Sequence, residues 1–151
     1  MTALLPLSLS ASVKLQRWAR LAAITPQHRD EHWLLHLTDQ SSPATPFPQT
    51  TTLHLVWSGL IWQLVSLTNA SDHYNQHHIT EELCFDAERR HYWRLHAGPE
   101  PAASPALLEQ TLTNLYQRHQ QGHVLIQCDP LPSPPPQPLN RSSALVRPSA
   151  R

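Results

Sequence analysis

The stretch TLHLVWSGLIWQLVSL, residues 52–67, carries most of the information about the predicted fold. Apolar residues recur at every second position on both sides of Ser58-Gly59, which is the period of a β-strand with one buried face. A two-residue turn at Ser58-Gly59 sets three apolar cross-strand pairs: Trp57 with Leu60, Leu55 with Trp62, and Leu53 with Leu64. The segment is therefore predicted to be an antiparallel hairpin that buries this face, with Trp57 and Trp62 close together.

A second alternating stretch is EHWLLHL, residues 31–37. Its tryptophan and two of its leucines alternate with His32 and His36, which predicts a strand with both histidines on the solvent side. On a helix, His28, His32 and His36 would instead stack as a metal-binding face. The alternation with tryptophan and leucine favours the strand.

Another hairpin is predicted in ELCFDAERRHYWRLH, residues 82–96. Pairing Phe85 with Trp93 also pairs Leu83 with Leu95, and it leaves a polar turn at residues 88–90. The last predicted strand is HVLIQC, residues 123–128, which places three side chains on one face: Val124, Ile126 and Cys128.

Two amphipathic segments predict helices. Residues 12–24 place Leu15, Trp18 and Ala22 on one stripe and end at Thr25-Pro26. Residues 105–121 follow Ser104 as N-cap and begin with Pro105. This second helix has Leu108, Leu112 and Leu115 on one stripe and Gly122 as its stop.

The predicted fold class is α+β, an antiparallel sheet of five or six strands covered by these two helices. Residues 1–130 are predicted to form a single domain. Residues 131–151 are rich in proline without apolar periodicity, so they are predicted to be a disordered tail. The segments 40–50 and 98–105 are interpreted as loops, because prolines interrupt both.

Composition argues against several classes of partner. Eleven basic and eleven acidic residues balance, which disfavours binding to nucleic acid or to an anionic membrane. No apolar run reaches the roughly 20 residues that a bilayer span requires, and no basic segment precedes the mildly apolar start. We therefore expect a cytoplasmic protein without a membrane span.

The stretch SDHYNQHHITEEL, residues 71–83, holds three histidines and three carboxylates. His73 and His77 lie at helical i, i+4 spacing and could supply two zinc ligands, with Glu81 or Glu82 as an unplaced third. The HExxH signature is absent, so the stretch is interpreted as a polar connection without metal. No cofactor and no catalytic residue is predicted, since the chain has no GxSxG motif and no glycine-rich phosphate loop.

The two cysteines, Cys84 and Cys128, each fall in a predicted strand. They lack the paired spacing of a zinc ribbon. The sequence favours two buried, small apolar side chains, and a disulfide between neighbouring strands is the alternative.

The run from Thr80 to Pro130, which includes SPALLEQTLTNLYQRHQQGHVLIQCDP, resembles the C-terminal domain of flagellar hook-length and type III secretion needle-length control proteins. Those domains similarly end in a hairpin, a leucine-striped helix that stops at a glycine, and a final strand. The resemblance covers about a third of the chain and transfers no functional residue. It implies a non-catalytic binding or adaptor protein of a bacterial type III secretion apparatus, with a protein partner.

The alternative function is a small histidine-dependent metal enzyme or hydrolase that uses His73, His77 and a carboxylate. Metal analysis of the purified protein distinguishes the two functions.

Overall fold

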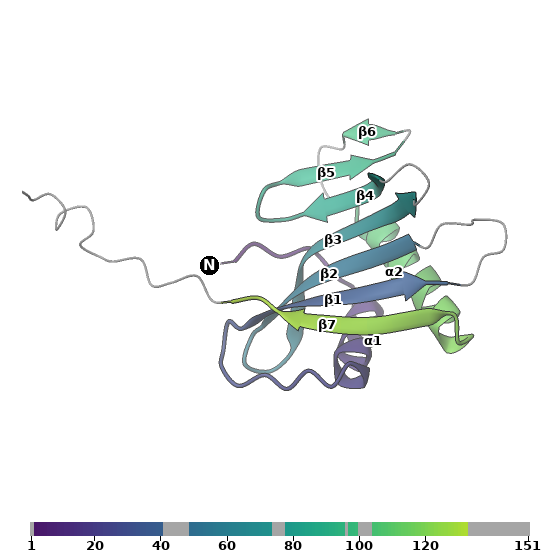
Figure 1. Ribbon diagram of the computed structural model, residues 1–151. Coiled ribbons are helices and arrows are strands. Elements are labelled where there is room, and N and C mark those ends of the chain that lie inside the picture. Colours follow the sequence, from purple (N-terminus) through teal and green to yellow (C-terminus); the bar gives the residue numbers. More distant parts are fainter. Residues whose placement is uncertain (1, 41–48, 74–77, 96, 100–103, 133–151) are drawn as a thin grey trace, which may run out of the picture.

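The computed structural model describes residues 2–40, 49–73, 78–95, 97–99 and 104–132. These residues form an α+β fold in which two helices lie on one face of a seven-stranded antiparallel sheet with the strand order β6-β5-β4-β3-β2-β1-β7 (Figure 1). The elements are α1 (Leu9–Leu21), β1 (His32–Asp39), β2 (Gln49–Trp57), β3 (Trp62–His73), β4 (His78–Asp86), β5 (His91–Arg94), β6 (Gly98–Pro99), α2 (Pro105–Gln120) and β7 (Val124–Pro130).

The α+β prediction is confirmed, and the sheet has more strands than the five or six predicted. The additional strand, β6, falls where a proline-broken loop was expected. At the other predicted loop, β2 begins at Gln49 rather than Thr52, because Gln49 and Thr50 extend the ladders to β1 and β3. Residues 41–48 of that loop and residues 133–151 of the predicted tail lie outside the described residues.

Both predicted helices are present. The first was predicted over residues 12–24 and runs from Leu9 to Leu21. It begins earlier because the Ser8 hydroxyl caps it by accepting a hydrogen bond from Ala11 N–H at 3.0 Å, and it also ends earlier, with Ala22 as C-cap. The second has the predicted Ser104 cap and ends at Gln120, with Gly122 in the left-handed region at φ +84°. Neither helix in the described part of the chain has the length and apolar character that a membrane span requires.

The β2–β3 hairpin has a different register from the one predicted. Trp57 lies opposite Trp62 rather than Leu60, because the turn contains four residues instead of two. The Ser58 side chain holds this longer turn, since its Oγ accepts hydrogen bonds from the N–H groups of Leu60 (3.2 Å) and Ile61 (3.0 Å). Leu60, predicted to be buried, is 86% exposed.

Next to the turn the pairing shifts by two residues, which keeps Trp57, Leu55 and Trp62 on their predicted face. Beyond the irregularity at His54 and Leu55, Leu53 lies opposite Leu67 rather than the predicted Leu64. Trp57 and Trp62 lie on the same face with ring centroids 5.1 Å apart, as predicted. Trp62 is buried, whereas Trp57 is only partly buried.

The β4–β5 hairpin is one residue out of the predicted register. Phe85 lies opposite Tyr92, and Trp93 lies opposite Cys84. The turn closes after Ala87, and Arg90 adopts a left-handed conformation at φ +52°. Because a one-residue shift exchanges the faces of a strand, Trp93 lies on the face opposite Phe85, and the Tyr92 ring meets Phe85 instead, at 6.2 Å.

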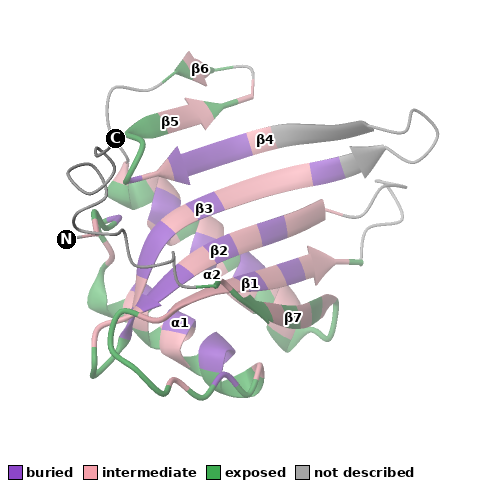
Figure 2. Cartoon of the chain, turned by 60° about the vertical axis from the view of Figure 1, so that its left-hand side comes forward, coloured by how far each residue is buried: buried purple, intermediate pink, exposed green. Residues whose placement is uncertain are grey.

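The core lies between the helices and one face of the sheet. Leucines from β1, β2 and β3 are fully buried there, and Trp18 of α1 packs against Tyr116 of α2 at 5.5 Å between rings. Figure 2 shows that buried positions alternate with intermediate ones along β1 and most of β2, as expected for strands with one covered face. The alternation in β2 ends at Leu55 and Val56, which are both buried.

Candidate functional site

The stretch predicted as a polar connection is mostly strand. Residues 71–73 end β3 and residues 78–83 belong to β4, with His73 paired to His78. The polar composition led to the wrong prediction, because the hairpin ladder between β3 and β4 and the β-branched Ile79 and Thr80 support a strand here. Ser71 is buried, and its hydroxyl donates a hydrogen bond to the Glu82 carboxylate.

The described residues contain no group of three or more His, Cys, Asp or Glu side chains arranged to hold a metal ion. His77 and the side chain of His73 lie outside the described residues, so the interpretation of this pair stays a prediction. The Glu82 carboxylate also accepts a hydrogen bond from the Gln49 amide at 3.4 Å.

Neither of the two cysteines, both of which the structure describes, forms a disulfide. Cys84 is buried in β4, and Cys128 is partly buried in β7, where its thiol donates to Ala22 O at 3.5 Å. Strands β3, β2 and β1 separate β4 from β7, so the alternative of a disulfide between neighbouring strands is wrong.

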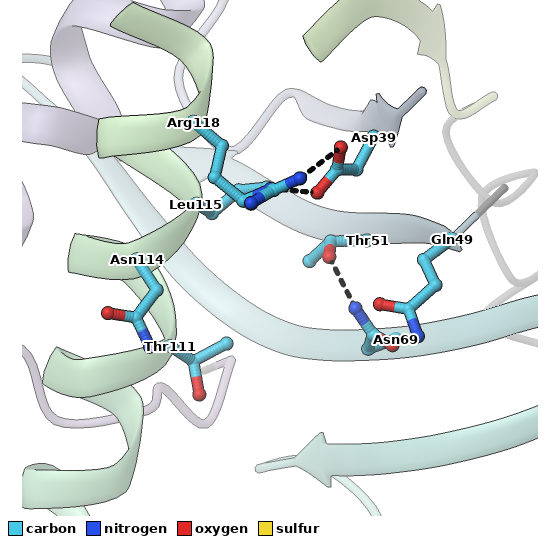
Figure 3. Close-up of a pocket in the computed structure, with 8 residues that line it drawn as sticks. All are labelled: Asp39, Gln49, Thr51, Asn69, Thr111, Asn114, Leu115 and Arg118. Atoms are coloured by element: carbon cyan, nitrogen blue, oxygen red, sulfur yellow. Dashed lines mark hydrogen bonds and ion pairs between the residues drawn. The ribbon is translucent and has the colours of Figure 1, made fainter. Parts of the chain in front are cut away.

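A polar pocket of about 200 Å³ opens between α2 and the helix-covered face of the sheet (Figure 3). Its lining comprises Asp39, Gln49, Thr51 and Asn69 from the sheet, and Thr111, Asn114, Leu115 and Arg118 from α2. Sequence reasoning missed this pocket. The signal that could have found it is a polar stripe at positions 111, 114 and 118, which have helical spacing beside the leucine stripe.

Most polar groups of this pocket bond to one another. The Arg118 guanidinium contacts the Asp39 carboxylate through two nitrogens, one of them at 3.3 Å, so the two charges offset each other. The Asn69 amide donates to the buried Thr51 hydroxyl at 2.8 Å. The lining contains neither histidine nor cysteine, so the pocket does not supply the chemistry of the predicted metal enzyme.

The second candidate is the open face, which we define as the sheet face opposite the helices. Its described positions are His32, Leu34, His36 and Thr38 of β1; Thr50, Thr52, His54 and Val56 of β2; Gln63, Ser66, Thr68 and Ala70 of β3; Cys84 and Asp86 of β4; His91 and Trp93 of β5; and Leu125, Gln127 and Asp129 of β7. At these positions, all with described side chains, there is no lysine, arginine or glutamate, and Asp86 and Asp129 lie on either side of an uncharged centre on β1, β2 and β3. In the β3–β4 ladder Glu81 also lies opposite Ala70.

Hydrogen bonds between neighbouring strands order this face. His36 lies between the Thr52 hydroxyl and the Asp129 carboxylate, each 3.1 Å from a ring nitrogen. The rings of His32 and His54 are in direct contact, with Nδ1 of His32 2.8 Å from Nε2 of His54. The prediction that His32 and His36 lie opposite the core is confirmed, although both are half-buried.

His54 is half-buried in the middle of the open face. Burial lowers the pKa of His54 because it disfavours the charged imidazolium, and the neighbouring His32 adds a smaller lowering. Asp86 and Glu88 act in the opposite direction without reversing the shift. Above its pKa, this ring therefore presents a neutral hydrogen-bonding group to the open face.

Comparisons with known proteins give the fold and no function. No family model matches the chain. No curated protein matches it significantly. Among solved structures, the chain is similar to "Structure of the hypothetical protein VC0508 from Vibrio cholerae VSP-II pathogenicity island", with a TM-score of 0.62 and 15% identity over 87% of this chain and 97% of that one. A likeness at this identity shows the fold alone.

Proposed function

We propose that this chain is a non-catalytic protein-binding module whose recognition surface is the open face. The observation that carries the proposal is the uncharged centre of this face on β1, β2 and β3, where the positions with described side chains include no lysine, arginine, aspartate or glutamate. Solvent-facing strand positions can accommodate charge at little cost, whereas the centres of protein interfaces are depleted in charged residues. The open face thus has the composition of an interface.

The side chains of this face are also suited to a protein partner. Hydrogen bonds such as that between the Thr38 and Thr50 hydroxyls, at 3.1 Å, hold the threonines in place. A preordered surface loses less conformational entropy when it is covered. Trp93 supplies a partly exposed aromatic group of the kind that anchors interfaces.

The resemblance of residues 80–130 extends the proposal to a cytoplasmic accessory protein of a bacterial type III secretion apparatus. The pattern behind that resemblance is present as the β4–β5 hairpin, α2 ending before Gly122, and β7. Strand β7 pairs with β1, however, so this run is not a separate unit of the fold. The assignment to a secretion apparatus stays a prediction.

The test is affinity capture from the native cells with the full chain and two arginine variants. Thr68→Arg puts a charge at the centre of the open face, and the control Gln117→Arg puts the same charge on the exposed side of α2. We expect partners that bind the parent chain and the control to be lost with Thr68→Arg. Equal capture by all three chains would show that recognition takes place elsewhere.

A further inference from the structure

The outer side of β7, called the β7 edge below, lacks the features that usually prevent sheet edges from pairing. Its seven residues follow β1 in one register without a bulge. The strand contains no lysine, and its first five residues are uncharged. Only Pro130, at its end, lacks an N–H group. In the described part of the chain no strand pairs with this edge.

Two hydrogen bonds fix the direction of every backbone group in β7. Gln40 N–H donates to His123 O, and Leu131 N–H donates to His32 O, both at 2.9 Å. Consecutive residues of a strand direct their N–H and C=O groups to opposite sides. Residues 125, 127 and 129 therefore bond to β1, and the outward groups belong to Val124, Ile126 and Cys128.

These outward groups are self-complementary in an antiparallel pairing. With a two-fold axis at Ile126, this residue lies opposite its own counterpart, and Val124 lies opposite Cys128 in both directions. In the same register His123 of each copy lies opposite Asp129 of the other. Because of the two-fold symmetry, this imidazole–carboxylate pair forms at two places in the dimer. No carboxylate of one copy lies opposite a carboxylate of the other in this register.

Neighbouring registers lose this complementarity. Moving the axis to Gln127 places Leu125 opposite Asp129, which sets an apolar side chain against a carboxylate. Moving it to Leu125 places His123 opposite Gln127 and leaves Asp129 without an imidazole partner from the other copy. A cross-strand imidazole–carboxylate pair can form a hydrogen bond and so stabilise the ladder, which favours the register centred on Ile126.

We infer that the β7 edge binds a second copy of this chain, forming a dimer in which two sheets join through antiparallel β7 strands centred on Ile126. The Asp129 carboxylate, already 3.1 Å from His36 and 70% exposed, receives the second imidazole from the partner. Both open faces stay uncovered and become continuous. This inference is independent of the proposed function, which concerns the open face.

The first test is a charge exchange followed by sedimentation equilibrium of the full chain from micromolar to millimolar concentration. The parent chain is expected to reach twice the 17.1 kDa mass of the monomer. His123→Glu places a carboxylate opposite Asp129 of the other copy at both symmetry-related positions. The dimer dissociation constant is expected to rise by at least about tenfold. Adding Asp129→Lys to the His123→Glu variant restores an opposite-charge pair and the dimer. Gln117→Glu, which adds a negative charge on α2, should change nothing.

The second test fixes the register by oxidative cross-linking in a Cys128→Ser background. Ile126→Cys lies opposite itself at about 5.5 Å between Cα atoms, within the range of a disulfide, whereas Leu125→Cys does not. We expect a covalent dimer from Ile126→Cys alone. Cross-linking only at position 125 would overturn the register. A parent chain that stays monomeric over the whole range would overturn the dimer, and the capture experiment on the open face would be unaffected.

Discussion

The two edges of the sheet differ in nearly every property that controls strand pairing. The β7 edge offers seven residues in an unbroken register, and β7 packs against the core through Val124, Ile126 and Cys128. The opposite edge is β6, which has two residues, one of them Pro99, and pairs with β5 at only two positions. A short edge that contains proline stops growth of a sheet, whereas a long regular edge permits it. Growth is therefore expected at β7.

The irregular pairings lie away from β7. The register shifts between β2 and β3 at His54 and Leu55, and between β3 and β4 at Asn69 and Ala70, whereas the β1–β7 ladder has no shift. Bulges bend and twist a strand, so they make the middle of the sheet uneven. The regular end of the sheet is the one that ends in β7.

The largest effect on stability is expected at Phe85 of β4, which connects the sheet edge that ends in β6 to the core. Phe85 is fully buried, so Phe85→Ala should cost about 3–5 kcal/mol of unfolding free energy. Its ring meets Tyr92, and a double-mutant cycle of these two residues should show about 0.5–1.5 kcal/mol of coupling beyond burial. Denaturant unfolding measures both quantities. A stronger coupling of Phe85 to Trp93 than to Tyr92 would favour the register predicted from the sequence.

Two proline variants test the two sides of β7 separately, the side that bonds to β1 and the β7 edge. Gln127→Pro removes an N–H group that faces β1 and leaves the His36 carbonyl without its donor, which should cost roughly 1–3 kcal/mol. Val124→Pro removes an outward N–H group at the first strand position, where proline is tolerated, so it should weaken the dimer more than the fold. Chemical denaturation and sedimentation of both variants give the comparison. Equal destabilisation of the fold would contradict the assigned backbone directions.

A smaller effect is expected at the β6 edge. Gly98 has φ +77°, a conformation that costs an L-residue roughly 1–2 kcal/mol, and a methyl group added there would meet no atom within 4 Å. Gly98→Ala should therefore lower stability by roughly 1–2 kcal/mol and leave the dimer dissociation constant unchanged. Thermal melts and sedimentation check the two parts. A change in dimerisation would show that the β6 edge also takes part in assembly.

The smallest effect is expected for the pH dependence of stability that arises from His54, in the middle of the open face. The pKa of His54 is lowered by burial and by His32, so in the range just below about pH 6.5 the unfolded chain binds a proton that the folded chain does not. Stability from this histidine is present above that pH and is lost as pH falls toward the folded pKa. The melting temperature of the parent chain should decrease on acidification, and His54→Gln should decrease less. A steeper decrease for the variant would contradict the assigned direction.

Local signals made much of the fold predictable. The helix α2 was predicted to within one residue because Ser104 and Gly122 mark its ends independently of the rest of the chain. The alternation of β1 and β7 was likewise sufficient to assign their faces. In contrast, both hairpin registers were wrong, because a side-chain bond from Ser58 and a left-handed Arg90 set the turns, and neither has a clear sequence signature.

The candidate surfaces depended on contacts between distant segments. The sequence placed His32 and His36 on the solvent side, but the uncharged centre of the open face became visible only with the order of the strands. Similarly, the β7 edge exists because β7 pairs with β1, far earlier in the chain, rather than with β5. The polar stretch 71–83 was misassigned because its partners in the ladder, such as Ser71 with Thr80, outweigh composition.

Hydrogen exchange of the β7 amides at two protein concentrations would measure the pairing of this edge residue by residue. At high concentration the outward amides of Val124, Ile126 and Cys128 should be protected like the inward amides of Leu125 and Gln127. Dilution should remove protection from the outward set alone, because only these amides depend on the second copy. Outward amides that exchange rapidly at every concentration, or that stay protected on dilution, would contradict pairing with a second copy.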